Sequence, residues 1–130
     1  MERRMSFFCI SENLAAEGAG SDDDVVVLAV SGEIDYAASP RLRGCVLDHI
    51  KDGGRRLVLD LSAATFIDST AIGVLVGAVS RLREVGGSLV VVCEEENERV
   101  RKIFEIAGVD SLIALHSSRD EALSALAGAG

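Results

Sequence analysis

Two kinds of hydrophobic pattern alternate along the chain. Short, nearly continuous runs of Val, Leu and Ile predict buried strands, and they cover residues 25–32, 55–62, 88–93 and 111–115. A segment with apolar residues three and four positions apart follows each run and predicts a helix. Another short apolar run, at residues 6–10, comes before all of these. The predicted order is therefore strand, strand, helix, followed by three strand–helix pairs.

Each helical segment has one apolar face. The inward positions are Leu42, Cys45 or Val46, and His49 or Ile50 in the first; Ile72, Leu75, Val79 and Leu82 in the second; Val100, Ile103, Phe104 and Ala107 in the third; and Leu123 and Leu126 in the fourth. Glycines at 53–54, 86–87 and 108 are expected to end the first three helices, and Ser118 or Asp120 to cap the fourth. Gly73 and Gly77, inside the second helix, are interpreted as small residues that let it pack closely on the sheet.

Strands that alternate with helices of this length predict crossover connections and a mostly parallel sheet. We expect one α/β domain over residues 1–130, with a five-stranded mixed sheet and four helices packed against it. Residues 12–24 are acidic and rich in glycine, and they are expected to form a long hairpin loop. The first strand is therefore expected at the edge of the sheet, antiparallel to the second.

The charge balance argues against several kinds of partner. The chain of 130 residues is 48% hydrophobic and has a net charge of −8, and its arginines are dispersed among acids. Nucleic acids and anionic membrane surfaces both need clustered Lys and Arg, so neither is expected as a partner. No apolar run approaches the ~18 residues that span a bilayer, and the apolar start is too short for a secretory signal. We expect a cytoplasmic protein that is a monomer when free.

The sequence offers little to a metal or a cofactor. Cys9, Cys45 and Cys93 are far apart and lack zinc-ligand spacing, so we expect free thiols that are buried or half-buried. The consecutive acids Asp22–Asp24 lack the alternating spacing of a calcium loop and are interpreted as a solvated loop. No metal and no cofactor is predicted.

A catalytic site is also not predicted. His49 and His116 have no neighbouring residues that suggest a nucleophile and its base, and the phosphate-binding glycine motifs are missing from the sequence. One alternative involves Asp60, in "VLDLS", which resembles the phospho-acceptor aspartate of response-regulator receivers. A receiver has an acidic pair after its first core strand and a lysine after its last. Here the three aspartates precede the strand and His116 follows the last one.

The stretch "TFIDSTAIGVLVGAV" contains three consecutive residues of the type that caps a helix, Asp68, Ser69 and Thr70. One cap is enough for one helix. Together with "VSGEIDYAASPRLR" upstream and "GGSLVVVCEEENERVRKIFEIAGVDSLIALHSSRDEALSAL" downstream, the region "VLDLSAATFIDSTAIGVLVGAV" resembles the bacterial anti-sigma-factor antagonists. These are small stand-alone STAS-domain proteins, and the resemblance covers about residues 25–126.

The resemblance implies a phosphorylation switch. In that family the serine after the aspartate, here Ser69, is phosphorylated by a serine kinase that is also the anti-sigma factor. The unphosphorylated antagonist binds this kinase and frees the sigma factor, and a phosphatase resets it. The family usually has glycine after this motif where the chain has Ala71, and a methyl group in the first helical turn could hinder the kinase. A STAS interaction module that is not phosphorylated is the other alternative.

The expected partner-binding residues are Asp35, Asp68, Ser69, Thr70 and Ala71. Asp68 is assigned to the cap, accepting from the N–H of Thr70 or Ala71, so the hydroxyl of Ser69 can point outward. Thr70 is expected to bond back to the helix or to line the same surface. Asp35, in "GEID", ends a strand, and the carboxyl ends of parallel strands share one edge of a sheet. Its loop should therefore lie beside Asp68–Thr70, although Asp35 could simply start a turn.

Overall fold

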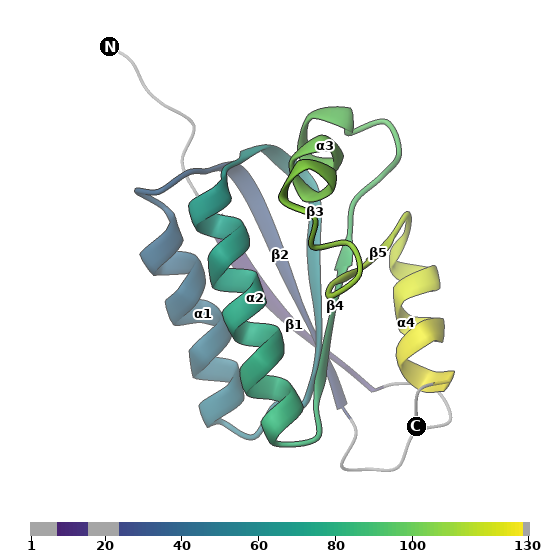
Figure 1. The fold of residues 1–130 in the computed structure, drawn as a ribbon. Helices are drawn as coiled ribbons and strands as arrows, with labels where there is room; N and C mark the ends of the chain where they lie inside the picture. The colour runs from purple at the N-terminus through teal and green to yellow at the C-terminus, as the bar shows by residue number, and fades with distance from the viewer. Residues whose placement is uncertain (1–7, 16–23, 129–130) are drawn as a thin grey trace.

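The helices and strands follow the predicted order. The computed structural model describes residues 8–15 and 24–128, and Figure 1 shows their arrangement. The elements are β1 (Phe8–Ala15), β2 (Asp24–Ile34), α1 (Ser39–Lys51), β3 (Arg56–Ile67), α2 (Ser69–Glu84), β4 (Ser88–Val92), α3 (Glu98–Ala107), β5 (Ala114–His116) and α4 (Arg119–Gly128). The α/β class and the four helices are confirmed.

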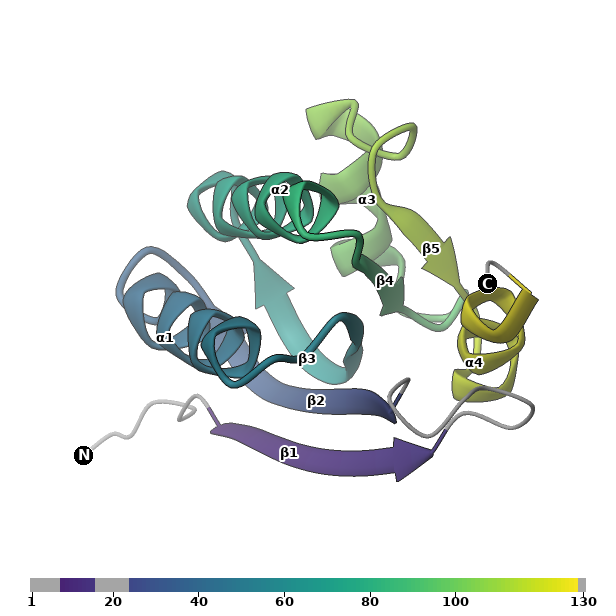
Figure 2. The same ribbon diagram turned by 90° about the horizontal axis from the view of Figure 1, so that it is seen from below.

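The strands lie in the sheet in the order of the sequence, β1-β2-β3-β4-β5. Strands β2 to β5 are parallel to one another, and β1 pairs with β2 in the antiparallel direction. Figure 2 shows α1 and α2 side by side on one face of the sheet and α4 on the other. The buried side chains of α3 join those of α1 and α2. One face therefore carries three helices and the opposite face carries one.

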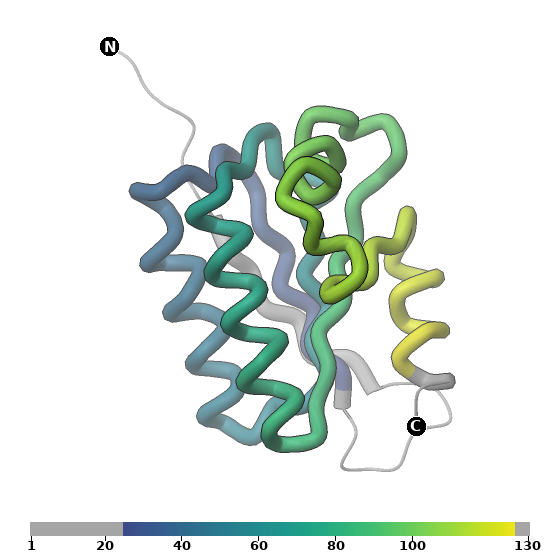
Figure 3. Tube along the Cα trace, viewed as in Figure 1, coloured from purple at the N-terminus to yellow at the C-terminus, as the bar shows by residue number. Residues whose placement is uncertain are grey.

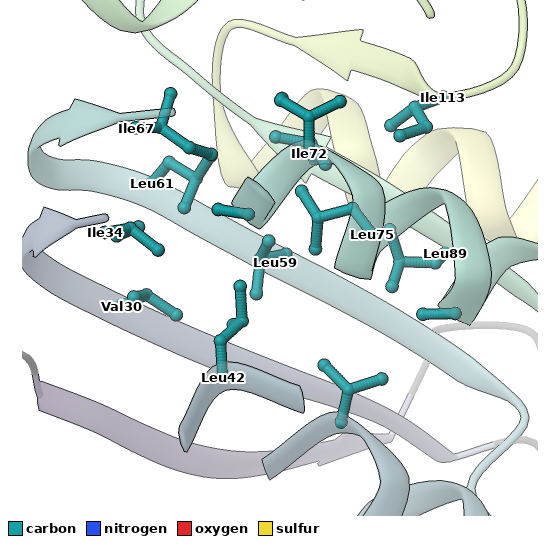
Figure 4. Close-up of a cluster of buried hydrophobic side chains, with 14 of the residues drawn as sticks. Val30, Ile34, Leu42, Leu59, Leu61, Ile67, Ile72, Leu75, Leu89 and Ile113 are labelled. Atoms are coloured by element: carbon teal, nitrogen blue, oxygen red, sulfur yellow. The ribbon is translucent and has the colours of Figure 1, made fainter. Parts of the chain in front are cut away.

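The larger core fills the space between the sheet and α1, α2 and α3. Figure 4 shows side chains from the strands and from α1 and α2 pointing toward one another, and Leu59 and Leu75 among them have no exposed area. The inward positions predicted for α2, which are Ile72, Leu75, Val79 and Leu82, are all buried. This helix is therefore held by the apolar face that its sequence predicts.

A smaller core fills the opposite face, under α4. Val27, Val58 and Val92 come from three adjacent strands and meet Ala122 and Leu126 of α4. Alternate residues of a strand point to opposite faces, so each inner strand supplies both cores. This explains why the strands read as nearly continuous apolar runs rather than as an alternation of apolar and polar residues.

The other helices match the predicted faces less closely. Buried positions are Leu42 and Val46 in α1, Val100 and Phe104 in α3, and Ala122 and Leu126 in α4, whereas Cys45, His49, Ile50, Ile103 and Leu123 are half-buried. Ala107 was predicted to face inward but is exposed, because it is the last residue of α3, before the left-handed Gly108. Ser118 caps α4 by accepting from the N–H of Glu121 at 3.1 Å.

Three strands have an end that lies three or more residues from its predicted position. β1 includes residues 12–15, which were expected in a loop, because its backbone pairs with β2 as far as Ala15 and Asp24. The remainder of that predicted loop, residues 16–23, lies outside the described residues. β3 continues past residue 62 to Ile67. β5 covers residues 114–116 rather than 111–115, because the N–H groups of Leu112 and Ile113 bond to the carbonyl of Val109 in a tight turn.

Gly73 and Gly77 do not pack on the sheet. Both lie on the exposed side of α2, where an added Cβ would have no atom within 4 Å. The interpretation that they bring the helix close to the sheet is therefore wrong.

The longest helix of the described chain is α2, with 16 residues. None of the described helices combines the length and the apolar character that a membrane span needs.

Beyond its middle, β3 has β2 as its one pairing partner within residues 8–15 and 24–128. Its ladder with β4 ends at Asp60 and Val92, whereas its ladder with β2 continues to Ile67. Two register shifts in the β2–β3 ladder each place one extra residue in β3, and Gly32 opposite them has a φ of 90°. Such bulges bend a strand. The two strands nevertheless finish level, with Ile34 opposite Ile67.

Candidate functional site

The loops that follow β2 and β3 lie side by side at the carboxyl edge of the sheet. Ile34 is opposite Ile67, and the N–H of Asp68 donates to the carbonyl of Ile34 at 3.2 Å. Figure 3 shows the chain turning from these two strand ends into α1 and α2 at the same end of the molecule. The predicted proximity of the Asp35 loop to Asp68–Thr70 is confirmed.

Asp68 is the cap of α2. Its backbone is extended, with φ −117° and ψ 179°, and its Oδ1 accepts from the N–H of Ala71 at 3.0 Å. Its carbonyl accepts from the N–H of Ile72 at 3.1 Å, which begins the helical ladder. One residue therefore satisfies the helix start, and the assignment of Asp68 to the cap is confirmed.

Ser69 and Thr70 take no part in capping. Both are exposed, and within the described part of the chain their side chains and their backbone N–H groups make no hydrogen bond. Thr70 lines the outer surface and does not bond back to the helix. The start of α2 thus presents two free hydroxyls and two free N–H groups to a partner or an anion.

Ala71 faces the other way. Its side chain has no exposed area and belongs to the larger core, together with Ile72 and Leu75. The expectation that its methyl group could hinder a kinase is therefore wrong, because that methyl group points into the protein. For the same reason its side chain is not available to the expected partner-binding surface.

Asp35 holds the turn into α1. Its Oδ1 accepts from the N–H of Ala38 at 3.1 Å, and its carbonyl accepts from both the N–H and the hydroxyl of Ser39 at 3.0 Å. Asp35 itself is half-buried, and the next residue, Tyr36, is 74% exposed. The interpretation that Asp35 starts a turn is confirmed, and its contact with a partner stays a prediction.

Known proteins share this arrangement over most of the chain. Residues 19–122 match the family described as "STAS domain". The chain belongs to the STAS domain family. The anti-sigma-B factor antagonist of Listeria monocytogenes serovar 1/2a is 30% identical over 109 residues, which are 84% of this chain and 94% of that protein.

Two further similar proteins are also described as anti-sigma factor antagonists. A putative anti-sigma factor antagonist of Bordetella bronchiseptica, BtrV, is 32% identical over 103 residues, which are 79% of this chain and 87% of that protein. The crystal structure of an anti-sigma factor antagonist from Mycobacterium paratuberculosis has a TM-score of 0.78 and 27% identity to this STAS domain. The match covers 93% of this chain and 94% of that one.

Asp60 is a structural residue of this STAS domain. It is 7% exposed, and its Oδ1 accepts from the N–H of Ser62 at 2.9 Å and from the hydroxyl of Ser62 at 2.6 Å. Its Oδ2 accepts from Nε of Arg119 on α4 at 2.6 Å. Burial acts to raise the pKa of the Asp60 carboxyl, but the bonds from Ser62 and Arg119 outweigh it and lower that pKa below 3.8.

The receiver interpretation of Asp60 is therefore wrong. A phospho-acceptor needs an open carboxylate, and both oxygens of Asp60 are occupied beneath α4. Sequence reasoning missed the Asp60–Arg119 pair because 59 positions separate the two residues. Only a polar residue in an otherwise apolar strand hinted that Asp60 had a partner.

A second missed residue closes the open edge of β3. Asn97 caps α3 by accepting from the N–H of Val100 at 3.5 Å, and its Nδ2 donates to the carbonyl of Ala64 at 2.9 Å. It therefore satisfies a β3 carbonyl that β4 does not reach. The cap could have been predicted, since Asn is a preferred residue before a helix, but the bond to Ala64 could not.

The cysteines and histidines add no second site. Cys93 is buried and free, and burial raises the pKa of its thiol, whereas Cys45 is half-buried and free. His49 and His116 are half-buried. Over the described residues, no three His, Cys, Asp or Glu side chains are grouped to hold a metal ion. Asp22 and Asp23 of the predicted acidic loop lie outside the described residues, as does the side chain of Cys9, whereas Asp24 is the first residue of β2 rather than part of a loop.

Proposed function

We propose that this STAS domain is an anti-sigma factor antagonist controlled by phosphorylation of Ser69. In its unphosphorylated form it binds an anti-sigma factor that is also a serine kinase, and the sigma factor is released. Phosphate on Ser69 ends the binding, and a phosphatase restores it. The single observation that carries the proposal is the exposed hydroxyl of Ser69, which no described residue bonds, next to Asp68, which already caps the helix. The names of the relatives support it.

A phosphate at this position should leave the fold intact. It adds about −1.5 to −2 charges at pH 7. The helix dipole and the free N–H groups of Ser69 and Thr70 favour an anion there by roughly 0.3–1 kcal/mol. Repulsion from the neighbouring Asp68 opposes this by a similar amount when both groups are in water. The two effects nearly cancel in the free protein.

A bound partner changes that balance. A protein that covers Ser69 must either remove water from a dianion or be kept away by it. A loss of about 3 kcal/mol of binding free energy would weaken the affinity roughly a hundredfold. The same group that is harmless to the fold would therefore control binding.

The function proposed here is binding without catalysis. It requires no metal and no cofactor, and the antagonist would act in the cytoplasm. Asp35 is included in the proposed partner surface because its loop is bonded to the loop of Asp68 through the carbonyl of Ile34. A phosphorylation-independent interaction module is the alternative that the experiment must separate.

The test uses the anti-sigma kinases encoded in the same genome. Each is incubated with ATP and the protein, and the intact mass is measured. We expect a gain of one phosphate in the wild type and in Ser80→Ala, which removes another exposed hydroxyl of α2. Ser69→Ala should gain none. If labelling persists in Ser69→Ala and disappears in Thr70→Ala, the phosphorylated residue is Thr70 and the assignment to Ser69 is wrong.

Binding is then measured by calorimetry with the kinase that labels the protein. The free energy of unfolding of Ser69→Ala should lie within ~1 kcal/mol of the wild-type value, because Asp68 still caps the helix. This variant should bind the kinase whether or not ATP is present, because it cannot be phosphorylated at position 69. Ser69→Glu should fold but bind weakly. If Ser69→Glu binds as tightly as the wild type and no phosphate is found, the module is not controlled by phosphorylation.

A further inference from the structure

A groove runs between α1 and α2 on the outer surface of the three-helix face. It is made of two adjoining hollows of about 360 and 520 Å³. The hollows share Arg43, Leu47, Thr70 and Val74, so they form one continuous depression. Figures 1 and 2 both show the two helices side by side along their length.

The length of the groove suits a helix rather than a small molecule. One end is lined by Tyr36 and Thr70 and the other by Arg81. From Thr70 to Arg81 a helix rises about 16 Å, or roughly three turns. Gly73 and Gly77 lie between them, one turn apart on the exposed side of α2, and their lack of side chains keeps the depression open.

The charge of the groove is opposite to that of the protein. Among the described residues, the charged side chains that line the groove are Arg43 and Arg81, both positive, although the whole chain has a net charge of −8. Arg43 and Arg81 line the groove and are exposed, and neither has an ion pair or hydrogen bond within the described residues. Apolar side chains, including Leu47 and Val74, lie between them.

We propose that this groove receives an acidic amphipathic helix of about three turns from the anti-sigma kinase. Its apolar side packs on Leu47 and Val74, and its carboxylates pair with Arg43 and Arg81. Thr70 lines the groove and directly follows Ser69, so one partner can cover the switch and fill the groove together. The inference rests on the proposed function, because it assigns a second contact to the same kinase.

The test measures kinase affinity in the Ser69→Ala background, in which phosphorylation cannot interfere. Gly77→Leu fills the groove and is compared with Ser80→Leu, which adds the same side chain outside it. Arg43→Glu and Arg81→Glu reverse the groove charge and are compared with Arg83→Glu, on the same helix but outside the lining. We expect each groove variant to lose about tenfold or more in affinity and each control to stay within about twofold.

Each outcome separates the two proposals. If the groove variants bind as well as their controls while Ser69→Glu does not bind, the groove assignment is wrong and the switch stands. If no kinase binds Ser69→Ala, both are wrong. A photo-crosslinker at position 77 should attach to a helical kinase segment containing several Asp or Glu residues. Attachment to a basic segment, or to a second copy of this chain, would also overturn the assignment.

Discussion

Asp68 and Ser69 are neighbours with opposite tasks. Asp68 is held by the helix that it caps, and its Oδ1 bonds to the N–H of Ala71. Ser69 is exposed and has no partner among the described residues. A side chain with no structural duty can be modified at small cost to the fold, whereas a capping residue cannot. The cap therefore makes the free serine possible.

The buried position of Ala71 leads to the first prediction. Ala71→Gly removes a fully buried methyl group and loosens the first turn of α2. The free energy of unfolding should fall by about 1–2 kcal/mol. The rate of Ser69 phosphorylation should stay the same, because the methyl group does not face the kinase. Denaturant unfolding and initial-rate labelling check the two effects, and faster labelling in the variant would mean that Ala71 does obstruct the kinase.

A second prediction concerns Asp60 and its pair with Arg119. Asp60→Asn should lower the free energy of unfolding at pH 7 by about 2 kcal/mol, which is less than for a fully buried pair because the Arg119 side chain is 36% exposed. Arg119→Gln should cost a similar amount. Urea unfolding at pH 7 measures both variants, with Asp120→Asn, an exposed acid in the same helical turn, as the control.

The pH dependence of that contribution has a definite sign. The pKa of Asp60 is lower in the folded protein than its ordinary 3.8, so the unfolded chain binds the proton more readily. The stabilisation is therefore complete above pH 3.8 and is lost as the pH falls through the lower, folded value. Asp60→Asn should lack this part of the acid dependence. Equal acid slopes in wild type and variant would contradict the assignment.

Sequence patterns gave the local part of the site and missed the long-range part. The cap at Asp68 and the outward Ser69 depend only on neighbouring residues, and both could be predicted. The inward direction of Ala71 depends on how α2 sits on the sheet, and the Asp60–Arg119 bond joins residues 59 positions apart. No periodic pattern encodes such contacts, so they had to come from the structure.

At the level of the elements, α2 carries two functions on two faces. One face packs in the larger core, and the other presents Thr70, Gly73 and Gly77 to the surface. Glycine inside a helix normally costs stability. Two glycines on the exposed face of α2 are therefore expected to lower the stability of the helix, and their role in keeping the groove open explains why they are there.

The third prediction compares two glycines. Gly77→Ala should raise the free energy of unfolding by about 0.5–1 kcal/mol, because the site is helical and an added Cβ has no atom within 4 Å. Gly86→Ala should lower it by a similar amount, because Gly86 has a φ of +79°. Thermal melts of the two variants should therefore shift in opposite directions. A loss of stability in Gly77→Ala would mean that the open space at this position is absent in solution.

The elements themselves were mostly predictable, and their ends were not. The spacing of apolar residues located all four helices, although only α2 among them buries every inward position that the spacing predicts. The continuation of β3 to Ile67 was not predicted, because the residues after 62 show no clear alternation of apolar and polar positions and are placed by pairing with β2. β1 likewise extends through polar residues because its backbone, not its side chains, makes the ladder.

At the scale of the whole molecule, charge is distributed unevenly. Arg43 and Arg81 are 38 positions apart and read as isolated residues, so the sequence suggested no basic stripe. The side-by-side packing of α1 and α2 places both on one groove. The net charge of −8 therefore conceals a local basic surface.

The fourth prediction uses the two sides of the sheet. Leu126→Ala leaves a cavity in the smaller core, where Leu126 is 2% exposed, and should lower the free energy of unfolding by about 2–4 kcal/mol. The affinity for the kinase should not change at temperatures where the variant is folded, because α4 covers the face opposite the groove. Calorimetric binding below the melting transition checks this. A loss of affinity in the folded variant would mean that α4 contributes to the partner surface.

The pairing of β3 beyond Asp60 with β2 alone has a consequence for local opening. Among the described residues, the loops that carry Asp35 and Ser69 follow a part of the sheet, beyond Ser31 of β2, in which β2 and β3 pair only with each other, and Asn97 bonds to its side. Two-stranded ribbons have little stability of their own. Backbone amides of residues 63–67 should therefore exchange with deuterium sooner than those of 57–60, through an opening that leaves the central sheet closed. Asn97→Ala should widen the difference, and equal protection of both segments would show that the extension opens only when the whole domain unfolds.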